Sequence, residues 1–76
     1  MSDPDYLELV AALRSRREEK GLTQQRLAGS LGRPQSFVAK YESCERRLDI
    51  IDVLRICRVL NLRLRDVLPA SWHSEL

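Results

Sequence analysis

The sequence is poor in the residues that mark turns and in soft metal ligands. Its 76 residues include three glycines, three prolines, two cysteines and one histidine. So few glycines and prolines argue against a turn-rich sheet, and the many Leu, Arg, Glu and Ala residues favour helices. Cys44 and Cys57 lack a C-x-x-C spacing, and a structural zinc site normally takes four ligands. We therefore predict two reduced thiols, no metal site and no cofactor.

Long apolar runs and catalytic groupings are also lacking. No segment has the apolar length that a bilayer requires, and residues 1–5 are acidic, unlike a signal peptide. The single histidine, His73, has no nucleophile elbow, glycine-rich loop or carboxylate pair near it. We therefore expect a cytoplasmic protein that does not contact a membrane and is not an enzyme.

Charge is distributed unevenly along the chain. The net charge is +2, but residues 1–13 carry −3 and residues 14–47 carry nine basic and four acidic side chains. A basic middle segment favours a polyanionic partner, although solvated helices often show the same pattern.

Local signals predict one domain, and they place the first two helices. Asp3 is typical of a helix cap, and Pro4 of the first residue inside a helix, because proline lacks only an N–H that would be unpaired there. Gly21 predicts the end of this helix. Thr23 then begins a second helix, which ends at Gly32.

The second half of the chain predicts three further helices. A third begins near Pro34 and runs to Glu42, and a fourth begins after Asp49 and ends at Asn61. A short fifth helix covers residues 64–68 and ends at Pro69. The apolar stripe expected on the fourth helix consists of Val53, Leu54, Cys57 and Leu60. We predict an all-α, compact five-helix domain over residues 1–69, with an irregular tail over residues 70–76.

Two short helices joined at a glycine are the most informative feature. Ala28, Gly32 and Val38 fit two helices that cross steeply, since a small side chain is needed at the contact and a glycine at the turn. A branched apolar residue then locks the second helix onto the first.

The sequence resembles the Cro/repressor-type helix-turn-helix regulators, also called the xenobiotic-response-element family. The resemblance implies a lambda-repressor-like domain whose third helix enters the major groove of double-stranded DNA. The matching residues are Leu13-Arg14-x-x-Arg17, Gly21-Leu22-Thr23-Gln24-x-x-Leu27-Ala28-x-x-Leu31-Gly32, Gln35-Ser36-Phe37-Val38-x-Lys40-Tyr41-Glu42, Arg46-Arg47 and Leu54-x-Ile56-x-x-x-Leu60.

The third helix has the residues that we expect to read bases. With Val38 facing inward, Gln35, Ser36, Ala39 and Lys40 face outward. Glutamine can pair with adenine, lysine can donate to guanine, and alanine can contact a thymine methyl group. The alternative is an ordinary solvated helix face.

Further positions match phosphate contacts and a scaffold pair of the family. The resemblance implies phosphate contacts for Gln24, Arg33, Ser43, Arg46 and Arg47, where the alternative is simple solvent exposure. It also implies an ion pair between Arg17 and Glu42 that holds the reading helix against its scaffold.

Cys44 departs from the family pattern, which has glycine at this position. Either the loop differs, or the site tolerates a left-handed cysteine at a cost on the order of 1 kcal/mol. A redox switch at Cys44 is a further alternative.

We expect a transcriptional regulator, most simply a repressor, that binds an inverted-repeat operator as a homodimer. Candidates for the dimer interface are Leu64, Val67, Leu68 and Trp72, although Trp72 can instead cover the core of its own domain. The alternative function is that of an antitoxin, a protein-interaction module that also regulates its own promoter.

Overall fold

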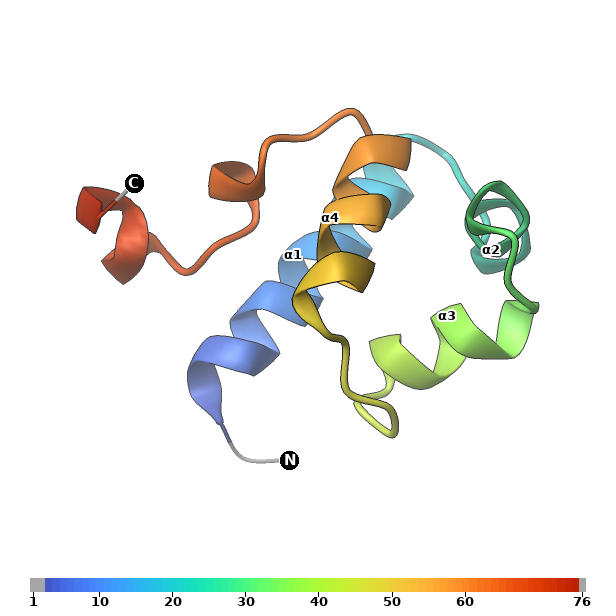
Figure 1. Ribbon diagram of the computed structural model, residues 1–76, viewed down its shortest axis with the longest axis horizontal. Coiled ribbons are helices and arrows are strands. Elements are labelled where there is room, and N and C mark those ends of the chain that lie inside the picture. The colour runs from blue at the N-terminus through green and yellow to red at the C-terminus, as the bar shows by residue number, and fades with distance from the viewer. Residues whose placement is uncertain (1–2, 76) are drawn as a thin grey trace.

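The computed structural model describes residues 3–75 as four α-helices followed by two 3₁₀ segments (Figure 1). Their bounds are α1 Pro4–Glu19, α2 Gln24–Leu31, α3 Gln35–Glu42, α4 Ile50–Val59, η1 Leu64–Asp66 and η2 Ala70–Glu75. The described residues include no strand, so the all-helical class is confirmed, but the expectation of five α-helices was wrong. No helix among them combines the length and apolar character needed to cross a bilayer. Met1, Ser2 and Leu76, which the predicted domain and tail include, lie outside the described residues.

α1 begins and ends as its sequence predicts. The Asp3 carboxylate accepts hydrogen bonds from the backbone N–H groups of Asp5 and Tyr6, at 3.0 and 3.3 Å. Pro4 is the first helical residue. Gly21 follows the helix with a φ of +69°, in the left-handed region that favours glycine.

α2 and α3 form the helix-turn-helix unit. The Thr23 hydroxyl accepts the Arg26 N–H at 3.1 Å and so caps α2, and Gly32 ends this helix with a φ of +68°. Figure 1 shows α2 nearly end-on while α3 runs across the view, so the two helices cross steeply. Ala28 and Val38 lie in the core at 1% and 0% exposure, as the steep crossing predicts.

α4 begins with a capping box and ends at a left-handed residue. The Asp52 N–H donates to the Asp49 carboxylate at 2.7 Å, and the Asp49 N–H donates to the Asp52 carboxylate at 3.4 Å. Asn61, just beyond the helix, has a φ of +56°. Both predicted boundary residues are confirmed.

The buried face of α4 differs from the predicted stripe at one position. Leu54 is 43% exposed, whereas Ile56 is 0% exposed and faces the core. Successive residues of a helix are about 100° apart, so Ile56 lies on the same side as Val53 and Leu60. Leu54 lies more than a quarter turn away, and its inclusion in the stripe was wrong.

The segment after α4 replaces the predicted fifth α-helix by a single 3₁₀ turn, η1. Pro69 lacks a donor and disfavours helical backbone in the residue before it, so it limits the helix on its C-terminal side. The tail, predicted to be irregular, is the 3₁₀ segment η2. It is attached to α1 because the Ala70 N–H donates to the Glu8 carboxylate at 3.2 Å.

Two buried tyrosines differ in their hydroxyl partners. The Tyr6 hydroxyl accepts the Leu48 N–H at 2.9 Å and so joins α1 to the segment before α4. Tyr41 is 0% exposed, and its hydroxyl has no hydrogen-bond partner among the described residues. Burial raises the pKa of Tyr41, because the phenolate would have to form in an apolar interior.

We expect Tyr41→Phe to raise the free energy of unfolding at pH 7 by about 1 kcal/mol, because it removes an unpaired buried hydroxyl. The folded-state pKa lies above the ordinary tyrosine value of 10.0, so wild-type stability falls as pH rises past that value. Tyr41→Phe should lack this component of the loss. Urea denaturation at pH 7 and about pH 11 measures both effects.

Tyr6→Phe is the matched control, since it removes a paired hydroxyl and should destabilise the protein at pH 7. A Tyr41→Phe variant less stable than the wild type would contradict the prediction.

Candidate nucleic-acid interface

α3 presents one polar face to solvent. Gln35, Ser36 and Lys40 are exposed and Ala39 is half-buried, while Val38 on the opposite side is fully buried. The structure therefore places the four predicted base-reading residues within less than half a turn of one another around the helix axis.

An ion pair joins α3 to α1. Arg17 donates to the two carboxylate oxygens of Glu42 at 2.7 and 3.1 Å, and its third nitrogen donates to the Leu22 carbonyl at 2.6 Å. The two side chains are only 9% and 2% exposed. The hydrogen bond to Glu42 is the largest influence that raises the pKa of Arg17. The structure thus brings together the pair that the resemblance implies.

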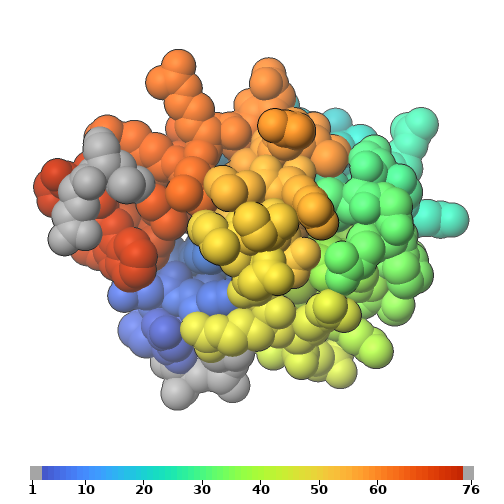
Figure 2. Space-filling view, viewed as in Figure 1, coloured from blue at the N-terminus to red at the C-terminus, as the bar shows by residue number. Residues whose placement is uncertain are grey.

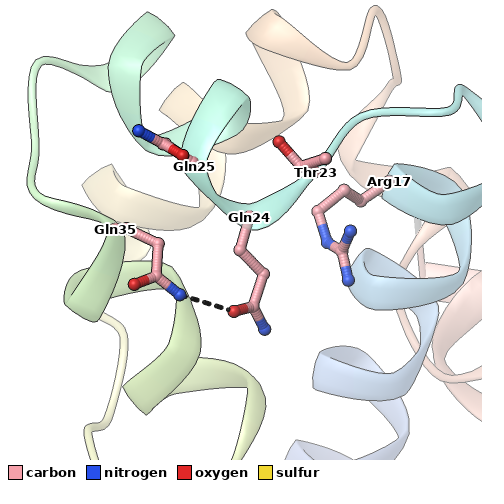
Figure 3. A pocket seen from close by; sticks show the side chains of 5 residues that line it. All are labelled: Arg17, Thr23, Gln24, Gln25 and Gln35. Carbon is pink, nitrogen blue, oxygen red and sulfur yellow. Dashed lines mark hydrogen bonds between the residues drawn. The ribbon is translucent and has the colours of Figure 1, made fainter.

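The ion pair continues into a hydrogen-bonded chain that reaches the exposed face of α3. The Gln24 amide N–H₂ donates to Glu42 at 2.9 Å, and the Gln24 amide oxygen accepts from the Gln35 amide at 2.9 Å. Figure 3 shows the Gln35 amide turned toward Gln24 across the gap between α2 and α3. Sequence reasoning missed this link, although both glutamines are the first residues of their helices.

The chain has a fixed direction because a carboxylate can only accept hydrogen bonds. Glu42 therefore requires the amide nitrogen of Gln24, which leaves the Gln24 oxygen for Gln35. Gln35 gives one N–H to Gln24 and keeps one N–H and its carbonyl oxygen. Adenine presents one acceptor, N7, and one donor, N6, in the major groove, and this remaining pair matches them.

An open depression of about 550 Å³ adjoins the chain at the beginning of α2. It is lined by Arg17, Thr23, Gln24, Gln25 and Gln35, which Figure 3 shows together. The N-terminus of a helix offers unpaired N–H groups and a partial positive charge. The depression is therefore suited to an anion such as a phosphate group.

Two of the candidate phosphate residues stack on one aromatic ring. The guanidinium of Arg33 lies 4.0 Å from the centre of the Phe37 ring, and that of Arg46 lies 5.0 Å from it. Arg33 also lies 3.8 Å from Asp52 of α4. Cation–π contact positions both arginines at the edge of α3, and sequence reasoning did not foresee this role of Phe37.

Arg47 and Ser43 have other partners in the structure. The Arg47 guanidinium lies 4.4 Å from the Tyr6 ring centre and 3.9 Å from the Asp3 carboxylate. The Ser43 hydroxyl lies 2.8 Å from the Glu45 carboxylate. Both side chains are exposed to solvent. To make the phosphate contacts expected for them, they would have to exchange these partners for phosphate groups.

The loop after α3 contains a left-handed cysteine. Cys44 has a φ of +64°, so the loop retains the backbone conformation that favours glycine, and the cysteine is strained there. Cys57 is buried in the core, and burial raises the pKa of its thiol. Both thiols are free.

The C-terminal candidates for a dimer interface lie in different surroundings. Val67 is 1% exposed and belongs to the core, so its prediction as a dimer-interface residue was wrong. Leu64 is partly buried and packs against the core. Leu68 and the 45% exposed Trp72 line a depression of about 170 Å³ that also includes residues of α1.

Comparisons with known proteins agree with this geometry. A family model described as a helix-turn-helix domain matches residues 8–70, and the chain belongs to this family. The protein is thus a helix-turn-helix DNA-binding regulator. No curated protein sequence matches the chain.

The fold is similar to that of the restriction-modification controller protein C.AhdI from Aeromonas hydrophila. The TM-score is 0.77 at 28% sequence identity, and the match covers 86% of this chain and 98% of that chain.

We expect the Arg17–Glu42 pair to contribute strongly to stability. Arg17→Met or Glu42→Gln should each cost about 3–5 kcal/mol of unfolding free energy, because each leaves a buried group without its partner. The double variant should cost less than the sum. Urea denaturation of the four proteins measures the coupling.

The exposed pair Arg14–Glu18, at 3.5 Å with both side chains 56% exposed, is the matched control. Its coupling should stay below about 0.5 kcal/mol. Additive effects at Arg17 and Glu42 would show that the two side chains are not coupled.

Proposed function

We propose that the protein is a sequence-specific transcriptional repressor that occupies its operator as a homodimer, with α3 of each copy in the major groove. The observation that carries the proposal is the oriented Gln35 amide, which is hydrogen-bonded to Gln24, whose own amide is oriented by Glu42. A side chain positioned in advance loses little conformational freedom when it pairs with a base. Similarity to a restriction-modification controller protein over nearly its full length supports a regulatory role.

In this proposal Gln35 reads adenine, and Ser36, Ala39 and Lys40 contact neighbouring base edges. Gln35 begins α3, and residues at the beginning of a recognition helix commonly reach the bases. Lys40, further along the exposed face, donates to guanine or to a phosphate group.

Phosphate contacts surround this base-reading face. The N–H groups at the beginning of α2 donate hydrogen bonds to a phosphate group in the open depression, so Gln24 contributes its backbone while its side chain stays in the chain to Gln35. Arg33 and Arg46, stacked on Phe37, contact phosphates at the edge of α3. Ser43 and Arg47 join them after exchanging their intramolecular partners.

Selection of bound sequences from random double-stranded DNA tests the function, and we expect an inverted repeat. Gln35→Ala should then weaken operator binding by about 1–3 kcal/mol and relax the preference at one position per half-site. Gln24→Ala should relax the same position, because Gln35 loses its support. Fluorescence anisotropy measures these affinities.

Gln25→Ala is the control, since Gln25 lies beside Gln24 but outside the hydrogen-bonded chain. It should leave the base preference intact. Equal losses of Gln35→Ala on operator and random DNA would show that Gln35 does not read bases.

The two loop arginines should differ in their salt dependence. Arg46→Ala should reduce the slope of log affinity against log salt by ~0.9 for each phosphate group that the variant no longer neutralises, and by twice that in a dimer. Arg47→Ala should change the slope less and lower the melting temperature more, because Arg47 contacts Tyr6 and Asp3. An unchanged slope for Arg46→Ala would remove Arg46 from the DNA footprint.

A further inference from the structure

α4 exposes three large aliphatic side chains on its first turns. Ile50, Ile51 and Leu54 are 59%, 50% and 43% exposed. Residues three and four apart are neighbours on a helix surface, so Leu54 adjoins both isoleucines. We call these three residues the α4 patch. The yellow-to-gold segment that contains them lies at the centre of the face shown in Figure 2.

We infer that two copies of the chain associate through the α4 patch, against each other around a two-fold axis. The inference rests on the proposed homodimer and identifies its interface. In a two-fold dimer the same surface meets itself, so an apolar patch on one copy is covered by the identical patch of the other. Three exposed aliphatic residues side by side are typical of a surface that is covered in an assembly.

The charges around the patch favour a second copy over an unrelated partner. Arg55 and Arg58 follow the patch on the exposed face, and no described carboxylate lies within ion-pair distance of either. Exposed Asp49 lies at the other end, as the cap of α4. A two-fold axis between Ile51 and Leu54 makes the two α4 helices antiparallel. The half of each α4 that carries Arg55 and Arg58 then lies near Asp49 at the N-terminal end of the partner helix. This arrangement also brings the partial positive N-terminal end of each helix close to the partial negative C-terminal end of the other.

The C-terminal segment, which the sequence favoured as the interface, is occupied within its own copy. Val67 is buried in the core, and η2 is attached to α1 through the hydrogen bond from Ala70 to Glu8. Trp72 lies in a depression shared with Tyr6 of α1. Trp72 is 45% exposed, but it lies beside α1 of its own copy, whereas the α4 patch has no cover among the described residues.

The patch is also rigidly placed relative to the reading helix. Residues 43–49 join α3 to α4, and the Leu48 N–H in this connection is held by the Tyr6 hydroxyl. Pairing through α4 therefore fixes the distance between the two α3 helices. A dimer that reads adjacent major grooves needs a spacing of about 34 Å, and a domain measuring 34 × 26 × 21 Å is large enough to supply it when doubled.

Sedimentation velocity in the absence of DNA tests the inference. We expect a wild-type dimer at micromolar concentration, and monomers for both Ile51→Glu and Leu54→Glu. Circular dichroism melting should show that both variants stay folded, since the side chains are exposed. Their affinity for a single half-site should be unchanged, while binding to the inverted repeat should weaken at least about ten-fold. Trp72→Ala, the control at the other exposed surface, should remain a dimer.

A cross-link provides a second measurement. Leu54→Cys in a Cys44→Ser background should form a disulfide-linked dimer under mild oxidation, because a residue near a two-fold axis lies close to its own copy. Ser71→Cys in the same background should not. A dimeric Ile51→Glu variant, a monomeric Trp72→Ala variant or a wild-type protein that is monomeric without DNA would overturn the inference. Failure of the wild type to bind any DNA would instead overturn the proposed function.

Discussion

The buried ion pair between Arg17 and Glu42 is the interaction on which the exposed face of α3 depends. Two charges removed from water are costly, and their attraction compensates only when the geometry satisfies both groups. Here all the guanidinium nitrogens have acceptors, and the carboxylate accepts from Arg17 and Gln24. These partners come from α1, α2, α3 and the α1–α2 turn, so a shift of any one of these elements would break the ion pair or a hydrogen bond that supports it.

The same ion pair also fixes the orientation of the two glutamine amides next to it. A neutral amide can turn either way, but a carboxylate next to it allows only one orientation. The charge of Glu42 thus sets Gln24, and Gln24 sets Gln35. In this way a buried charge determines which donor and acceptor Gln35 of α3 presents to solvent.

Three arginines show how a small domain positions charge on its aromatic rings. Arg33 and Arg46 lie on Phe37, and Arg47 lies on Tyr6, so each guanidinium rests on an aromatic ring close to α3 or to its loop. α4 divides its surface in a comparable way, with one side in the core and the other exposing aliphatic side chains. Its buried side completes the fold, and its exposed side remains available for association.

Local signals in the sequence were enough to place the boundaries of the four α-helices and to pair α2 with α3 as a helix-turn-helix. The Asp3 and Thr23 caps and the left-handed Gly32 act over three or four residues, so they can be read without knowledge of the fold. Only the tertiary structure decided three features. These are the exposed side of α4 on which Leu54 lies, the replacement of the predicted fifth helix by a 3₁₀ turn, and the hydrogen bond between Gln24 and Gln35. These features depend on packing between elements far apart in the sequence, and a periodic pattern cannot tell a core-facing leucine from an exposed one.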